Sequence, residues 1–188
     1  RSPLWPPVLM SSQSIGSYAA GGVPVLDLHE LAAGKLCALF DRNASRDLFD
    51  VHRLLDSSEF DRDRLRLAFV VYGGGSRRDW RTVSGDDITL DPEEAERQLI
   101  PMVRSEIVPA QKDRARWGNE LVDDCRRLVK AILPLEEHEL EFLTRLNDRG
   151  EIAPHLLTPD ETMRNLIQSQ PTLHWKAENV RQFKQGSE

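Results

Sequence analysis

Charged side chains between residues 30 and 50 have the types and spacing that phosphate chemistry needs. Lys35 falls on the apolar stripe of a predicted helix, so its ammonium should face the buried side and require an anionic partner. Asp47 and Asp50 are three residues apart, which places both carboxylates on one side of the next helix. This grouping suits a polyphosphate and its metal, because an ammonium attracts phosphate oxygens while carboxylates hold Mg²⁺ or orient an attacking hydroxyl.

The same residues also allow a purely structural interpretation. Acidic residues in a first helical turn stabilise the helix dipole. Lys35 can also pair with Asp47 or Asp50 in a structural ion pair. The pattern alone leaves both interpretations open, because structural ion-pair networks are common.

Two helices joined by a short connection must position these groups. The pattern Asp27-Leu-His-Glu30 resembles a capping box and predicts the start of the first helix. The apolar residues of that helix share one stripe, made of Leu28, Leu31, Ala32, Leu36 and Leu39. A second helix is predicted from about residue 46 to 56, with Leu48, Val51, Leu54 and Leu55 on its apolar side. The short connection lets Lys35 meet the two aspartates.

Helical patterns also dominate the rest of the chain. A helix at 61–72 should end at the glycines 73–75, and Asp91-Pro92-Glu93-Glu94 is typical of a helix start. Two amphipathic helices are predicted at 119–133 and 134–149, and another should open at 158–161. Strand signals are almost confined to a short segment at 23–28. The expected fold class is α+β and predominantly α-helical.

Composition excludes several classes of protein. The chain has 188 residues and a net charge of -6. This charge excludes a protein that coats nucleic acid with a uniformly basic surface. Its longest apolar run, 67–72, is far shorter than the roughly 20 residues of a membrane-spanning helix. No signal peptide is visible, so we expect a cytoplasmic protein without membrane contact. Cys37 and Cys125 are expected to be reduced core thiols, and the five histidines lack the spacing of a zinc site.

A glycine-rich segment at 72–91 is predicted to be a long surface loop. Within it, Arg77, Arg78 and Arg81 flank Trp80, a combination that can bind RNA through stacking and phosphate contacts. A mobile exposed loop without a ligand is the alternative.

The segment 25–55 resembles the conserved centre of the AbiEii/AbiGii toxin family of nucleotidyltransferases. In that family a helix of the form E-L-x-A-x-K-L-x-A-L leads through a D-R turn into R-D-L-x-D-x-x-x-L-L. The matching residues here run from Glu30 to Leu39, then Asp41-Arg42, and then from Arg46 to Leu55. The resemblance extends over nearly the whole chain. It implies transfer of a nucleotide from a nucleoside triphosphate, with Mg²⁺, to an acceptor such as the 3′ end of tRNA, and a possible cognate antitoxin.

The resemblance also implies roles for individual residues. Lys35 matches the family lysine that contacts the triphosphate, and Arg42 matches the basic residue that closes the same motif. Asp47 and Asp50 match the next motif, whose first aspartate is essential for activity. The implied catalytic residues are Asp47 and Lys35, and the implied substrate-binding residues are Lys35, Arg42, Arg46 and Asp50.

The sequence departs from the family pattern upstream of Lys35. Family members carry a Gly-Gly-x-x-Leu phosphate motif and a metal-binding D-x-D there, whereas this sequence has only Asp27 and Glu30 as acidic residues. No metal ligand is therefore assigned. We expect a remnant of the nucleotidyltransferase fold that is catalytically incomplete by itself, and the first residue, Arg1, suggests a piece of a longer protein.

This expectation divides the chain into three parts. They are a partial nucleotidyltransferase core at 1–72, a loop at 73–90 and a helical portion at 91–188. The alternative function is a non-catalytic helical module that binds RNA or an antitoxin-like partner protein.

Overall fold

Apolar residues at helical spacing build nearly all of the elements in the computed structural model, which describes residues 2–57 and 59–185. Arg1 therefore lies outside the described residues. The eight α-helices of the described part are α1 Leu28–Arg42, α2 Ser45–Ser57, α3 Arg62–Gly74, α4 Pro92–Glu94, α5 Arg114–Leu128, α6 Glu137–Arg149, α7 Glu161–Gln168 and α8 Pro171–Gln185. Short helical turns fill the connections. They are a π-helical turn at Ala95–Leu99 and 3₁₀ turns at Trp80–Thr82, Gly85–Asp87, Ile100–Met102, Gln111–Asp113, Val129–Ala131 and Pro154–Leu156.

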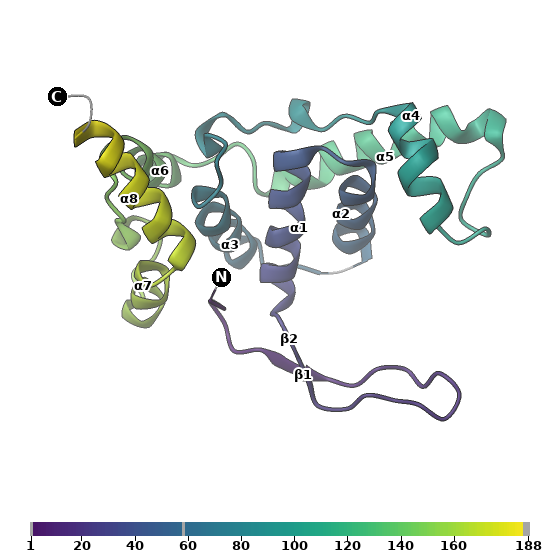
Figure 1. Cartoon of the computed structure of the whole chain (residues 1–188), viewed down its shortest axis with the longest axis horizontal. Coiled ribbons are helices and arrows are strands. Elements are labelled where there is room, and N and C mark those ends of the chain that lie inside the picture. Colours follow the sequence, from purple (N-terminus) through teal and green to yellow (C-terminus); the bar gives the residue numbers. More distant parts are fainter. Residues whose placement is uncertain (1, 58, 186–188) are drawn as a thin grey trace.

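The first three α-helices form the centre of the molecule (Figure 1). Asp27 caps α1 by accepting a hydrogen bond from the backbone N–H of His29 at 2.9 Å, as the sequence predicted. The buried stripe of α1 packs against both α2 and α3. Leu36, Leu48 and Phe69, one from each helix, are fully buried at this junction. The apolar periodicity therefore positions α1 and α2 as the site requires.

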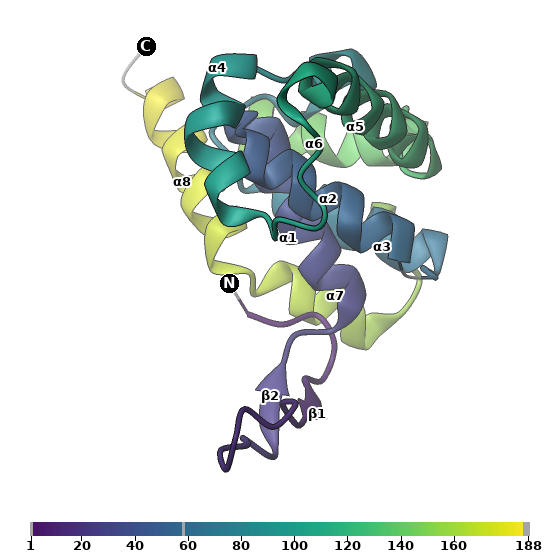
Figure 2. The same cartoon turned by 90° about the vertical axis from the view of Figure 1, so that its right-hand side faces the viewer.

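The later helices pack around this centre. In the fold, α5 lies against α2, while α6 pairs with α8 and both contact α3 (Figures 1 and 2). Buried residues from all of these helices belong to one hydrophobic core. Gly150, with φ 63°, ends α6 in the left-handed conformation predicted for a C-cap glycine. The division into parts at 1–72 and 91–188 stays a prediction.

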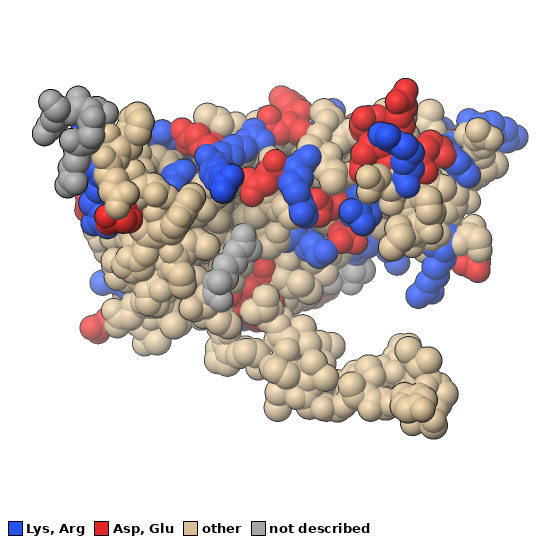
Figure 3. All heavy atoms as spheres, viewed as in Figure 1, with Lys and Arg blue, Asp and Glu red and all other residues tan. Residues whose placement is uncertain are grey.

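Two short antiparallel strands form an arm that projects from the helices in both views (Figures 1 and 2). Strand β1, Val8–Met10, pairs with β2, Val23–Val25, in a register that sets Met10 opposite Val23. No charged residue occurs between residues 2 and 26, and the arm is uniformly tan in Figure 3. With these two strands the fold is α+β and mostly helical, which confirms the predicted class.

Both predictions for Trp80, RNA binding by stacking or a place in a mobile exposed loop, were wrong. Its side chain is fully buried and packs against Phe40 and Phe69, with ring centroids 5.9 and 5.1 Å away. Arg78 pairs with Asp87 at 2.7 Å instead of lying free for a phosphate. A large apolar ring flanked by charges gives no local sign of burial, because its partners lie on helices far away in the sequence.

None of the helices in the described part of the chain combines the length and the apolar composition that crossing a membrane requires.

Candidate functional site

A tight connection between α1 and α2 brings the predicted site residues together. Asn43 ends α1 in the left-handed conformation, with φ 50°, and its backbone N–H donates to the Leu39 carbonyl at 2.7 Å. The chain then reverses, so that α2 begins at Ser45 and packs antiparallel along α1. The N–H of Ser45 donates to the Glu94 carboxylate at 3.0 Å, which ties the start of α2 to the last residue of α4. This hairpin sets the first turns of α2 beside the last turns of α1.

Two ion pairs bridge the helices of this hairpin. The Nζ of Lys35 donates to Oδ2 of Asp50 at 2.6 Å. The guanidinium of Arg42 binds Asp47 with both of its arms, from Nε to Oδ2 at 3.1 Å and from Nη2 to Oδ1 at 2.9 Å. The sequence predicted that Lys35 can meet both aspartates, but in the structure it pairs with Asp50 while Asp47 binds Arg42.

The expectation that Lys35 is buried was wrong, because its side chain keeps 41 % of its surface exposed and its partner Asp50 keeps 46 %. Lys35 lies at the edge of the apolar stripe of α1, where a long side chain can reach solvent. Such a pair contributes about 0–1 kcal/mol to stability. The ammonium is consequently available for exchange with a stronger anion.

A cavity of about 350 Å³ opens over α1 on the side of these charges. Lys35, Arg42 and Asp47 all line it, whereas Asp50 lies in an adjoining hollow that shares Lys35. Because Lys35 and Arg42 are seven residues apart on one helix, their backbone positions are about 10 Å apart along its axis. Arg46 is exposed and lines neither hollow. The structure therefore brings together four of the five predicted site residues and leaves Arg46 apart.

Glu30 lies in the same cavity and has a role that the sequence reading missed. Its carboxylate is fully buried and accepts hydrogen bonds from the backbone N–H groups of Leu4 at 2.8 Å and Trp5 at 3.1 Å. The hydroxyl of Tyr72, on α3, donates to it as well. The capping-box pattern explained Glu30 as a residue of the helix start, but its carboxylate instead joins the N-terminal segment and α3 to α1. No local sequence pattern predicts these partners, because they are 25 or more residues away from Glu30 in the sequence.

The histidine beside Glu30 belongs to a separate polar cluster. Although burial opposes the shift, hydrogen bonds from His29 hold the pKa of Asp27 below its usual range. Arg64, on α3, adds an ion pair to the same carboxylate at 3.1 Å. This cluster fastens the start of α1 to α3 and does not face the cavity.

The carboxylates around the cavity do not fit the Mg²⁺ that the resemblance implies. Both oxygens of Glu30 accept hydrogen bonds from protein groups, and both oxygens of Asp47 are bound by Arg42. Mg²⁺ needs carboxylate oxygens that are free to coordinate it in octahedral geometry. Across residues 2–57 and 59–185, no group of three or more metal-ligating side chains is positioned to hold an ion.

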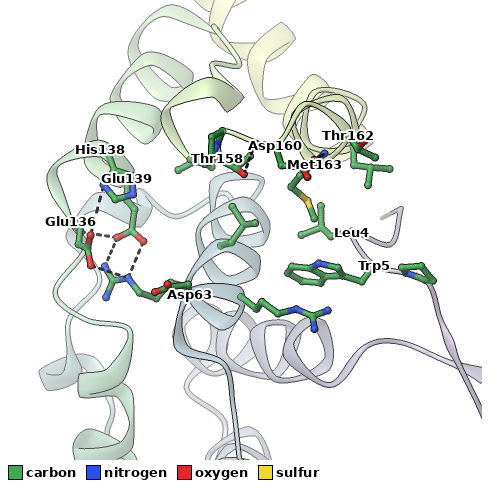
Figure 4. A pocket seen from close by; sticks show the side chains of 17 residues that line it. Leu4, Trp5, Asp63, Glu136, His138, Glu139, Thr158, Asp160, Thr162 and Met163 are labelled. Atoms are coloured by element: carbon green, nitrogen blue, oxygen red, sulfur yellow. Dashed lines mark hydrogen bonds and ion pairs between the residues drawn. The ribbon is translucent and has the colours of Figure 1, made fainter.

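A larger cavity, of about 920 Å³, lies between α3, α6, α7 and the N-terminal segment (Figure 4). On one wall Arg66 and Glu139 form a buried ion pair. On the opposite wall the Arg64 guanidinium lies 4.5 Å from the ring centroid of Trp5. Asp160 is occupied as the N-cap of α7. Acidic side chains outnumber the two arginines in its lining, so this cavity suits a phosphate less well than the cavity of Lys35 and Arg42.

The sequence pattern of the whole chain agrees with this local arrangement. Residues 1–187 match the family described as nucleotidyl transferase AbiEii toxin of type IV toxin–antitoxin systems. The chain belongs to the AbiEii family. No curated protein and no solved structure matches it.

Membership of the AbiEii family confirms the resemblance, including its predicted extent over nearly the whole chain. It places the chain in a family of nucleotidyltransferase toxins from type IV toxin–antitoxin systems. The helices α1 and α2 are the elements of this AbiEii chain that carry the lysine and aspartate motifs. The roles of the individual residues stay predictions.

Proposed function

We propose that the hairpin of α1 and α2 binds the triphosphate of a nucleoside triphosphate in a nucleotidyltransferase toxin. The observation that carries this proposal is the cavity of about 350 Å³ into which Lys35 and Arg42 both open from one face of α1. Two cations along one helix can engage successive phosphate groups of an extended chain. The acceptor that we propose is the 3′ end of an RNA such as tRNA, as in the family that the chain resembles, and the reaction would take place in the cytoplasm.

Each aspartate holds one of the cations. Asp47 has only about 10 % of its side chain exposed and binds Arg42 in the bidentate geometry that fixes a guanidinium most firmly. Arg42 itself keeps 66 % of its side chain exposed, so a phosphate can reach it without displacing Asp47. Asp50 keeps the ammonium of Lys35 at the boundary of the cavity until a triphosphate replaces it. In this proposal Lys35 and Arg42 touch the substrate, and Asp47 and Asp50 position them.

Titration calorimetry of the polypeptide 1–188 with ATP, CTP, GTP and UTP in the presence of Mg²⁺ tests the proposal. We expect Lys35→Ala to weaken the binding of the preferred nucleotide about tenfold to a hundredfold, because a charge-assisted contact to phosphate is lost. Asp47→Ala should also weaken it, since Arg42 then loses its fixed orientation. Lys130→Ala is the matched control, because this lysine is exposed on the 3₁₀ turn that follows α5.

Two outcomes would contradict the triphosphate assignment. One is a nucleotide affinity that Lys35→Ala and Asp47→Ala both leave unchanged. The other is an equal loss of affinity in the Lys130→Ala control, which would show that only the overall charge matters.

Binding without transfer is the second candidate function, and the occupied carboxylates of Glu30 and Asp47 favour it. Two-metal activation of a hydroxyl requires carboxylates that can hold the ions. We therefore expect the polypeptide 1–188 to bind a nucleotide but to transfer no labelled nucleotide from any nucleoside triphosphate to total tRNA. Robust Mg²⁺-dependent labelling of the tRNA would exclude this second candidate and favour an enzyme.

A further inference from the structure

Two large aromatic side chains lie exposed on α8, away from the site described above. Trp175 keeps 52 % of its surface exposed and Phe183 keeps 79 %. Trp175, Asn179 and Phe183 follow one another at intervals of four residues, so they form one row along the helix. The two rings are separated by eight residues, or about 12 Å of helix. Exposed aromatic residues in a row are suited to bind a partner that has flat apolar surfaces.

Cations lie directly beside this aromatic row. Lys176 and Lys184 belong to the adjacent row of α8, and Arg77 joins them from the segment after α3. All five side chains line a groove of about 570 Å³, which we call the α8 groove, together with Asn147, Asp148, Asn179 and Val180. Asp148 is the acidic residue among them, and Arg81 already binds its carboxylate at 2.9 Å. The α8 groove therefore has a net positive charge.

Aromatic faces next to cations match the chemistry of a single-stranded nucleic acid. Unpaired bases stack on exposed rings, while lysine and arginine contact the phosphates between them. A protein partner fits less well, because the centres of protein interfaces are depleted of lysine. The two asparagines, Asn147 and Asn179, add donors and acceptors suited to base edges.

Hydrogen bonds connect the α8 groove to the end of α1. The Ser76 hydroxyl donates to the Asp41 carboxylate at 2.6 Å, and Asp41 directly precedes Arg42 in α1. The Ser76 carbonyl accepts a hydrogen bond from the ammonium of Lys176 at 2.9 Å. Arg77 is the next residue and lines the groove. The α8 groove is therefore linked through Ser76 to the C-terminal end of α1, which carries Arg42.

We propose that the α8 groove binds a single-stranded nucleic acid through stacking on Trp175 and Phe183 and phosphate contacts to Arg77 and Lys184. It would present the end of that strand to the cavity of Lys35 and Arg42, and this second part rests on the proposed function. The polarity of the groove suits RNA and DNA alike, so the experiment must distinguish them.

Fluorescence anisotropy with labelled single strands of about 12 nucleotides, in RNA and DNA versions, measures this binding directly without any nucleotide present. Trp175→Ala and Phe183→Ala should each weaken it about fivefold to a hundredfold, as expected for the loss of a stacked base. Lys184→Ala should weaken it and lower the slope of log affinity against log salt by about 0.7. Arg116→Ala is the control, because this arginine is 80 % exposed on α5 and does not line the α8 groove. Circular dichroism of each variant checks that it is folded.

The results separate this proposal from the triphosphate proposal. We expect Lys35→Ala to leave the affinity for the strand unchanged, and Trp175→Ala to leave the affinity for the nucleoside triphosphate unchanged. Tighter binding of RNA than of DNA would identify RNA as the ligand, and equal binding would support a general single-strand groove. Absence of binding to both strands, or equal affinities for the wild type and both aromatic variants, would overturn the proposal. In that case the apolar side chains of α8 would be better explained as a docking site for a protein.

Discussion

Glu30 shows how much one buried carboxylate can hold in place. It is fully buried, and it gains two backbone hydrogen bonds from the N-terminal segment and one from the hydroxyl of Tyr72. Leu4, whose N–H it accepts, is itself a core residue. The carboxylate therefore replaces the water that these three donors would otherwise need.

Removing this carboxylate should destabilise the protein markedly. Glu30→Ala leaves three donors without a partner, so we expect the free energy of unfolding in urea to fall by about 3 kcal/mol or more. Glu30→Gln, which keeps the shape and one carbonyl oxygen, should lose less. Glu106→Ala is the control, because Glu106 is exposed. A loss for Glu30→Ala no larger than that of the control would show that the hydrogen bonds are not needed for stability.

At the scale of the element, the glycines 73–75 do more than stop a helix. The helix was predicted to end at residue 72, but α3 continues through Gly73 and Gly74 before Gly75 caps it. A Cβ built on Gly73 would lie 2.0 Å from the ring of Trp80. The missing side chain is what allows the indole to pack closely against the end of α3 and become buried.

Gly73→Ala should therefore lower the stability through overpacking. We expect the free energy of unfolding to fall by about 1–3 kcal/mol or more, because the indole must move out of a closely packed site. Gly85→Ala is the matched control, since the nearest atom to its Cβ would be a Val129 methyl at 3.7 Å, an ordinary contact. Thermal unfolding of both variants makes the comparison. Equal midpoints for the two variants would be incompatible with this packing of Trp80.

At the scale of the whole molecule, the arm stands apart from the helical core. Its residues from 7 to 24 are all exposed, including Ile15 and Tyr18, which keep 81 % and 82 % of their surfaces exposed. Met10 and Val23 form the last pair of the ladder, and the hydrogen bonds beyond it, between Ser12 and Ala20 and between Ile15 and Tyr18, stay within residues 11–22. The core should fold without this connection.

Replacing residues 11–22 with Asn-Gly should leave the stability of the protein nearly unchanged. The two-residue turn suits the pairing of Met10 with Val23, and no buried residue is removed. We expect the free energy of unfolding to change by less than about 0.5 kcal/mol, as is usual for surface changes. Solubility should increase, because two exposed apolar side chains are lost. A large drop in stability would mean that the arm packs against the helices in solution.

Much of the candidate site was readable from the sequence because its determinants are local. The capping aspartate of α1, the apolar stripes and the short connection depend on residues within a few positions of one another. They predicted the hairpin of α1 and α2 and the meeting of Lys35 with Asp50. The pairing of Arg42 with Asp47 also follows from that hairpin, although the sequence reading had left the partner of Asp47 open.

The sequence by itself determined the mostly helical class, the approximate positions of α1, α2, α3 and α6, the family and the composition of the charged hairpin, whereas α5 begins at Arg114 instead of residue 119 and α8 was not predicted. Only the tertiary structure decided what surrounds that hairpin: the three donors on Glu30, the burial of Trp80, the exposure of Lys35 and the α8 groove. The reason is that periodicity reports which face of a helix is apolar, but not which distant segment covers it. Trp80 and Trp175 have the same side chain, and one is buried while the other is half exposed. Their different surroundings come from segments that are remote in sequence and adjacent only after folding.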